Sequence, residues 1–198
     1  GQSLEGRELW ALQFNTTAAH REAGVSTKPG VIFLGTHHAR EHLSTEIPLL
    51  LAQYLAEHQR DADLNDLLQN RDIWIVPLVN PDGSEYDIGG TDYRWWRKNR
   101  SINPDQTFGV DLNRNYGFGW GGEGSSNRPS SDVYRGPAPF SEPETQAVKA
   151  FIDGHLNSKI LLSFHTFSEL ILYPWGHRYE NVPAERDRRV FEILAQTM

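Results

Sequence analysis

The sequence contains no cysteine and only one methionine among its 198 residues. Without cysteine the fold has no disulfide, so cysteine usage leaves the redox compartment of the protein open. Zinc sites built on thiolates are excluded for the same reason. Any metal site in this chain is therefore built from histidine and carboxylate side chains, and eight histidines are present to supply it.

The chain also lacks an excess of positive charge and any long apolar run. It has 19 lysines and arginines against 26 aspartates and glutamates, which gives a net charge of −7. An acidic chain disfavours nucleic acid and anionic membrane surfaces, because both bind basic faces. No apolar stretch approaches the roughly 20 residues that cross a bilayer. We expect neither nucleic acid nor a membrane as partner, while the oligomeric state is not determined by the sequence.

Short apolar runs alternate with segments of helical periodicity. Buried strands are predicted at 31–35, 73–79 and 160–164, with further candidates at 8–15 and 170–173. Helices are predicted at 44–58, 64–69, 143–155 and 184–198. Asn80 to Gly83 predicts a turn, and Ser141 to Glu144 predicts a capping box. The alternation predicts one α/β domain over residues 1–198, with a mixed, largely parallel, twisted sheet and helices on both faces.

Histidine and acidic side chains follow two of the predicted strands. The stretch LGTHHAREH places His37, His38, Glu41 and His42 directly after the first buried strand, and His165 follows the run at 160–164. Functional sites of open α/β sheets gather at the carboxyl ends of the strands. These side chains are therefore candidate metal ligands.

Three interpretations of these side chains remain open. In the first, His38 and His42 bind zinc from one helix face with Glu41 as the base, which needs a helix already formed at residue 38. In the second, His38 and Glu41 lie in a strand-to-helix turn and His165 completes the set. Two histidines and one glutamate leave a fourth position open, as in catalytic zinc sites. In the third, the same groups are hydrogen-bonded polar side chains without a metal.

Six motifs occur along the chain in this order: HARE at 38–41, NPDG at 80–83, WRKNRS at 96–101, GVDLNRNY at 109–116, YRG at 134–136 and SFHTFSELILYPWG at 163–176. Together they resemble the zinc metallocarboxypeptidases of the pancreatic carboxypeptidase A/B type, and most of all the bacterial carboxypeptidase T branch. The resemblance runs over nearly the whole chain. It implies a zinc carboxypeptidase-like fold, hydrolysis of the C-terminal peptide bond of peptides and proteins, one Zn²⁺ per chain, and secretion to the extracellular space.

The resemblance assigns His38, Glu41 and His165 as the zinc ligands. It makes Asp111 the carboxylate that orients a ligand imidazole. Such a partner fixes the tautomer of the ring and raises its basicity. His37 and His42 match no ligand of the family, and we expect both to be neighbours of the site.

The resemblance also assigns the residues that bind substrate. Arg97 matches the arginine that stabilises the oxyanion, Asn113 and Arg114 match the pair that binds the terminal carboxylate, and Arg40 matches a subsite arginine. A guanidinium suits these roles because it stays charged and binds a carboxylate through two parallel hydrogen bonds. The alternative for Arg97 and Arg114 is a purely structural role in a surface ion pair, which contributes only about 0–1 kcal/mol to stability. Their occurrence within the motifs WRKNRS and GVDLNRNY favours the substrate-binding role.

Compared with the family, the chain is expected to be truncated at both ends. The first helix and strand of the family would precede Gly1, and the general-base glutamate and most of the side-chain pocket would follow Met198. Loss of one general acid–base group typically lowers a rate by about 10²–10⁴-fold. We therefore expect an active parent protein and a chain that, by itself, is inactive or nearly so.

The sequence pattern is compatible with other functions and with a second metal ion. A zinc amidase acting on cell-wall peptides, a catalytically dead zinc- or carboxylate-binding module, and a structural α/β domain without metal are compatible with parts of the pattern. By resemblance to the bacterial branch, Ca²⁺ is a candidate second ion. Its candidate ligands are Asp61, Asp63, Asp66 and Glu85.

Overall fold

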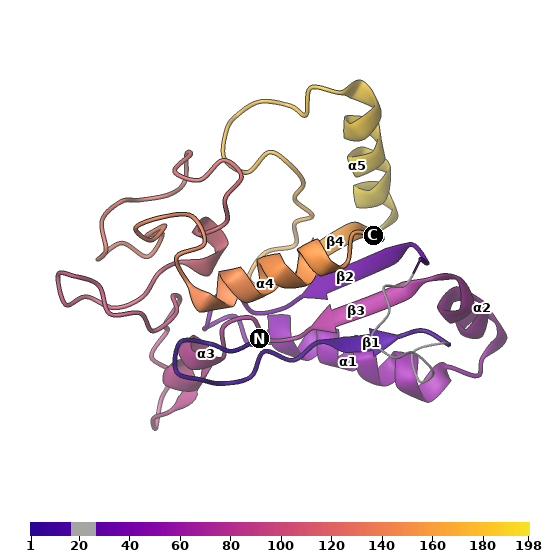
Figure 1. Ribbon diagram of the computed structural model, residues 1–198, viewed down its shortest axis with the longest axis horizontal. Helices are drawn as coiled ribbons and strands as arrows, with labels where there is room; N and C mark the ends of the chain where they lie inside the picture. Colours follow the sequence, from indigo (N-terminus) through magenta and orange to yellow (C-terminus); the bar gives the residue numbers. More distant parts are fainter. Residues whose placement is uncertain (17–26) are drawn as a thin grey trace.

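The structure is a computed structural model that describes residues 1–16 and 27–198. Its centre is a four-stranded sheet in the order β1–β3–β2–β4 (Figure 1). Strand β2 (Gly30–Leu34) pairs in parallel with both β3 (Asp72–Val76) and β4 (Ser158–Ser163), whereas β1 (Leu12–Phe14) pairs antiparallel with β3. The prediction of a mixed, largely parallel sheet is confirmed.

Helices cover both faces of this sheet (Figure 1). Helices α1 (Leu43–His58) and α2 (Ala62–Asn70) pack on one face, and α4 (Pro143–Gly154) packs on the other. The remaining helical segments are α3 (Pro81–Ile88), the 3₁₀ helix η2 (Leu112–Arg114) and α5 (Glu185–Thr197). Within residues 1–16 and 27–198, no helix is long and apolar enough to cross a membrane.

Alternation along the strands divides the core into two clusters. Ile32 and Leu34 of β2 point to the α4 side, where Val148 lies. Ile73 and Ile75 of β3 point to the opposite side and pack with α1 and α2. Because successive strand residues face opposite sides, a continuous apolar run serves both clusters. The continuous apolar runs of β2 and β3 are thus explained by burial of these two central strands on both faces, whereas alternate residues of β4 are exposed.

Two local predictions differ from the structure. Asn80 does not begin a simple turn: its side-chain oxygen accepts a hydrogen bond from Gly83 N at 3.0 Å and caps α3, with Pro81 in the first turn. This arrangement suits proline, which has no N–H to donate. Residues 170–173 form no strand, because no neighbouring strand within the described residues pairs with them.

The predicted capping box at the start of α4 is also wrong. The N-cap residue is Glu142, which makes no side-chain capping bond, and Pro143 begins the helix. Glu144 is fully buried and turns away from the cap. Its carboxylate accepts hydrogen bonds from Leu4 N at 3.0 Å and from Asn99 Nδ2 at 3.3 Å. A long-range contact has replaced the local capping bond.

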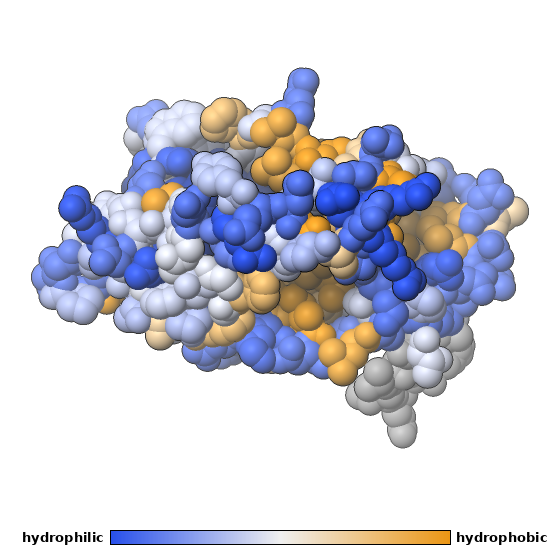
Figure 2. Space-filling model, turned by 90° about the horizontal axis from the view of Figure 1, so that it is seen from above, coloured by the Kyte–Doolittle hydropathy of each residue, from blue (hydrophilic) through white to orange (hydrophobic). Residues whose placement is uncertain are grey.

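The side of the molecule formed by β4, the segment after it and α5 carries many exposed apolar side chains. Figure 2 views this side and shows apolar and polar patches together. No residue of α5 is buried. The large exposed hydrophobic residues of this side include Leu161, Leu170, Leu172, Val190 and Ile193.

Candidate metal and substrate site

The turn that carries the first cluster is possible because residue 35 is glycine. Gly35 follows β2, and its N–H donates to Val76 O at 2.8 Å. A Cβ atom at this position would lie 2.3 Å from the carbonyl oxygens of both Pro77 and Ser44. Only glycine allows the start of α1 and the chain after β3 to approach this closely. This close packing fixes the position of the backbone from which the chain continues to His37 and His38.

Hydrogen bonds from side chains of α1 and of the Asn80 segment stabilise this turn. Thr36 is fully buried with a φ of 47°, an unfavourable region for a β-branched residue, and its Oγ1 lies 2.9 Å from Ser44 Oγ. The side-chain amide of Asn80 donates to His37 O at 3.0 Å and to Lys98 O at 3.2 Å. Asn80 therefore joins the turn, the start of α3 and the loop near residue 98.

Three potential ligand side chains converge beyond this turn. His38 Nδ1 lies 2.7 Å from Glu41 Oε1, and His165 Nδ1 lies 2.8 Å from Glu41 Oε2. The two Nδ1 atoms are 3.2 Å apart. One ligand atom from each of the three residues lies within 4.8 Å of the others. His38 and Glu41 are buried, whereas the side chain of His165 is 31% exposed, so the group opens to solvent on that side.

The charges within the group stabilise one another. Burial alone would raise the pKa of Glu41, but hydrogen bonds from His165 and His38 outweigh it and lower that pKa to about 2. Burial likewise disfavours protonated His38, yet its contacts with Asp111 and Glu41 raise its pKa above the ordinary value. Glu41 is therefore a carboxylate across the physiological range, the form in which it binds a cation.

Asp111 connects the metal group to the arginine beside it. Its Oδ1 lies 3.1 Å from His38 Nε2, which leaves Nδ1 of that ring facing Glu41. Its Oδ2 accepts hydrogen bonds from Arg97 Nε at 3.2 Å and Nη2 at 2.9 Å. Arg97 Nη1 lies 3.9 Å from Glu41 Oε1. The guanidinium is thus held at the edge of the metal group with one nitrogen turned towards it.

The structure distinguishes the two ligand sets that the sequence left open. Residues 37–41 are not helical, and α1 begins only at Leu43. His42 does not join the group: its Nε2 lies 2.8 Å from Asp87 Oδ2 in α3. A helix-face pair of His38 and His42 is therefore not formed. His38, Glu41 and His165 are brought together across 124 residues by the parallel pairing of β2 and β4.

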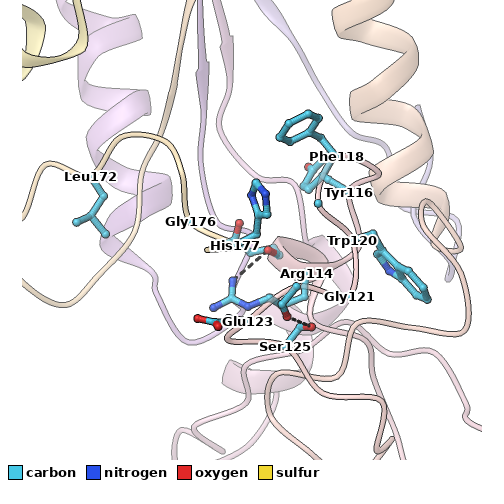
Figure 3. Close-up of a pocket in the computed structure, with 13 residues that line it drawn as sticks. Arg114, Tyr116, Phe118, Trp120, Gly121, Glu123, Ser125, Leu172, Gly176 and His177 are labelled. Carbon is cyan, nitrogen blue, oxygen red and sulfur yellow. Dashed lines mark hydrogen bonds between the residues drawn. The ribbon is translucent and has the colours of Figure 1, made fainter. Parts of the chain in front are cut away.

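A cavity of about 400 Å³ lies next to η2 (Figure 3). Asn113 N donates to Asp111 Oδ1 at 3.0 Å, so the cavity-lining residues of η2 directly follow the carboxylate of the metal group. The Arg114 guanidinium donates to Gly124 O at 2.8 Å and to Asn113 O at 3.0 Å. The side chains that line the cavity include Asn113, Arg114, Tyr116, Phe118, Trp120, Glu123 and His177.

Arg40 does not line this cavity. Its Nη1 donates to Trp95 O at 3.2 Å. The same nitrogen lies 3.6 Å from Asp132 Oδ2. Its side chain is partly exposed, so a substrate can reach it.

Sequence reasoning missed the residues that support the site from behind. Asn80 belongs to a recognised motif, but only its turn propensity was interpreted. Ser163 and Tyr116 belong to two of the six motifs, but serine and tyrosine are common in strand ends and loops, so their residue types alone indicate no contact with the site. Ser163 Oγ lies 3.3 Å from His165 Nε2, and Tyr116 Oη lies 2.7 Å from His37 Nε2.

The candidate calcium residues are not brought together. The only group of three or more potential ligands in residues 1–16 and 27–198 is the one formed by His38, Glu41 and His165. Asp61 instead lies 3.0 Å from His58 Nδ1, and Asp66 accepts a hydrogen bond from Asn70.

The chain is similar in sequence to proteins that are named as carboxypeptidases. A sequence model of the zinc carboxypeptidase family matches residues 1–198. Carboxypeptidase A5 of Macaca fascicularis is 38% identical over 189 residues, which cover 94% of this chain and 41% of the relative. Metallocarboxypeptidase A of Arthroderma otae is 37% identical over 205 residues, which cover 100% of this chain and 47% of the relative.

Solved structures give the same result for the fold. Thrombin activatable fibrinolysis inhibitor superposes with a TM-score of 0.86 at 30% identity, over 100% of this chain and 47% of that one. Carboxypeptidase A from Helicoverpa armigera superposes with a TM-score of 0.80 at 33% identity, over 100% of this chain and 46% of that one. The chain spans less than half the length of these relatives.

Proposed function

This chain belongs to the zinc carboxypeptidase family, and from that membership we propose that its protein is a metallocarboxypeptidase that hydrolyses the C-terminal peptide bond of peptides and proteins. The observation that carries the proposal is the convergence of His38 Nδ1, His165 Nδ1 and the Glu41 carboxylate beside the guanidinium of Arg97. In this proposal, residues 1–198 form part of a single catalytic domain.

The three ligand residues fit zinc in number and in chemistry, and the spacing of their two imidazole nitrogens is close to that of zinc ligands. Two imidazoles and one carboxylate are the donor set of several catalytic zinc sites. Atoms about 2.0–2.1 Å from a tetrahedral zinc lie roughly 3.3–3.4 Å from one another. The 3.2 Å between the two Nδ1 atoms is close to this spacing. Zinc bound there would supply Lewis-acid chemistry, by activating water and polarising a carbonyl.

The residues of the chain would divide the remaining tasks. Arg114 and Asn113 bind the free carboxylate of the substrate, because they line the cavity and lie within one short helix of Asp111. Arg97 turns Nη1 towards the metal group, where negative charge develops on the scissile carbonyl oxygen. Because Asp111 holds two nitrogens of Arg97, this charge is oriented before the substrate arrives.

Other parts of the proposal rest on resemblance. The general base is a glutamate outside residues 1–198, Arg40 contacts the substrate one residue further from the cleaved bond, and the protein acts outside the cell. Proton transfer to the leaving amine is assigned to that glutamate.

Replacement of Arg114 by alanine in the full-length protein tests the proposed substrate class. We expect kcat/KM for peptides with a free C-terminus to fall by about 30-fold or more, because loss of a charged hydrogen-bonding partner typically costs about 2–5 kcal/mol. Peptides with an amidated C-terminus should be poor substrates of both proteins. The exposed Arg128, in the loop after η2, provides the matched control as Arg128→Ala. Equal loss for free and amidated peptides would show that Arg114 does not bind the carboxylate.

The alternatives predict other outcomes of the same assay. A zinc amidase would cleave cell-wall peptides and depend little on the terminal carboxylate. A catalytically dead module would bind zinc or carboxylate-bearing peptides without turnover. Direct measurement of zinc together with a peptide panel separates these cases.

A further inference from the structure

A line of hydrogen-bonding groups runs away from the metal group on the side of His165. His165 Nε2, the ring nitrogen that faces away from Glu41, lies 3.3 Å from Ser163 Oγ. The same oxygen lies 3.2 Å from His37 Nδ1, and His37 Nε2 lies 2.7 Å from Tyr116 Oη. The line joins three segments that are distant in sequence.

We propose that His37 and Ser163 are positioning residues for the ligand His165, with His37 acting through the serine hydroxyl. This inference rests on the proposed zinc site. The second ring nitrogen of each ligand histidine has a different partner. Nε2 of His38 contacts the Asp111 carboxylate, whereas Nε2 of His165 contacts the Ser163 hydroxyl. A metal-binding histidine needs such a partner, because the bond made by its second nitrogen fixes the tautomer and the ring orientation.

The proton positions follow from counting donors and acceptors. If His165 Nδ1 binds the metal, its Nε2 carries the proton and donates to Ser163 Oγ. The donor and acceptor roles of the two His37 nitrogens depend on the tautomer of that ring. In one tautomer the Tyr116 hydroxyl donates to Nε2, Nδ1 carries the single N–H proton and donates it to Ser163 Oγ, and the serine proton turns to solvent. In the other tautomer Nε2 donates to Tyr116 Oη and the serine hydroxyl donates to Nδ1. In both arrangements Ser163 Oγ accepts the hydrogen bond from His165.

His37 therefore keeps Ser163 in the acceptor role that His165 requires. Without His37, the hydroxyl is free to rotate and to exchange its bond with solvent. The ring of His37 is 2% exposed and is nearly parallel to that of His165, at an interplanar angle of 20° and a centroid distance of 5.8 Å. Because His37 is buried, its ring is held in place, although Ser163 next to it is exposed to water.

Zinc affinity, measured by competition with a chromophoric chelator, is the direct test. We expect Ser163→Ala to weaken zinc binding by about tenfold, at the lower end of the 10–100-fold range for such partners because the serine is exposed. Ser163→Thr retains the hydroxyl and should bind zinc within about threefold of the wild-type protein. Ser130→Ala, at an exposed serine in a loop, is the matched control.

A double-mutant cycle then separates positioning from general packing. His37→Phe should weaken zinc binding in the wild-type background but have little further effect in Ser163→Ala. Additive effects, or unchanged zinc affinity in Ser163→Ala, would overturn the inference. Tyr116→Phe provides a milder variant if His37→Phe fails to fold, with a smaller loss expected in the same direction. If the wild-type protein itself binds no zinc, the proposed function fails instead.

Discussion

At the scale of the residue, two buried glutamates show how partners decide the behaviour of a carboxyl group. Glu41 is surrounded by imidazoles, which lower its pKa to about 2 although burial opposes this. Glu144 is also buried, and there burial prevails: its pKa is raised above the ordinary 4.5, although Leu4 N and Asn99 donate to it, and the nearby charge of Glu142 acts in the same direction as burial. The same side chain is thus an anion in one place and a weaker acid in the other.

This difference predicts a pH dependence of stability. Because the folded pKa of Glu144 is raised, the folded state binds its proton more tightly than the unfolded state does. Its contribution to the free energy of unfolding is fully present below pH 4.5 and declines as the pH rises through the raised pKa. We expect the stability of the wild-type protein minus that of Glu144→Gln to fall as the pH rises above about 4.5, as measured by urea unfolding.

The matched control is Glu46→Gln, since Glu46 is an exposed glutamate in the first turn of α1. This variant shows how much of the pH dependence follows from removal of any exposed carboxylate. Glu41 does not interfere, because its lowered pKa changes stability only as the pH falls below about 4.5 towards 2. A flat curve for Glu144→Gln would show that burial of this carboxyl group is not the source of the shift.

At the scale of the element, the junction between β2 and α1 is the part with least tolerance. Gly35→Ala would place a methyl group against the carbonyl oxygens of Pro77 and Ser44, both of which belong to the backbone. We expect a loss of about 1–3 kcal/mol in the free energy of unfolding, as is typical of overpacking. Zinc affinity should also fall, because His38 and Glu41 follow within six residues. Chemical denaturation and chelator competition measure the two effects.

Gly154→Ala provides the control for this substitution. Gly154 is the last residue of α4, and a Cβ atom there meets nothing within 4 Å. Alanine lowers the conformational entropy of the unfolded chain, so a gain of up to about 1 kcal/mol is expected, with zinc affinity unchanged. Equal losses in both variants would show that close approach at Gly35 does not constrain the site.

The same elements show what the sequence could and could not predict. The strands β2 and β3 were predictable because burial on both faces requires continuous apolar runs, and β4 was predictable from its apolar run although alternate residues of that strand are exposed. The start of α4 was not, because Ser141 and Glu144 have the local pattern of a capping box while Glu144 is used for a contact 140 residues away. Residues 170–173 have strand-like composition, but composition does not reveal whether a neighbouring strand is present to pair with them.

At the scale of the whole molecule, the candidate ligands were accessible to sequence reasoning because they follow strands. Parallel strands place their carboxyl ends at one edge of the sheet, so His38, Glu41 and His165 were expected to meet there. Of the supporting groups, only His37 was expected to lie near the site, and its contacts were not predictable. Ser163, His37 and Tyr116 come from three segments, and only the folded chain shows that their polar atoms form one line.

The candidate site also joins distant parts of the fold, which gives a prediction that does not depend on catalysis. His38 and Glu41 lie between β2 and α1, whereas His165 follows β4, so zinc bound to all three would connect segments 124 residues apart. Zinc at 100 times its dissociation constant stabilises the folded state by about 2.7 kcal/mol. For a domain of this size that corresponds to a rise in Tm of roughly 5–10 °C.

Differential scanning calorimetry with zinc or with a chelator should show this rise in the wild-type protein and its loss in His165→Ala. His58→Ala, at an exposed histidine outside the group, should retain it. A rise that persists in His165→Ala would mean that zinc binds elsewhere, because the two remaining ligands belong to one short turn and cannot hold β4 to it.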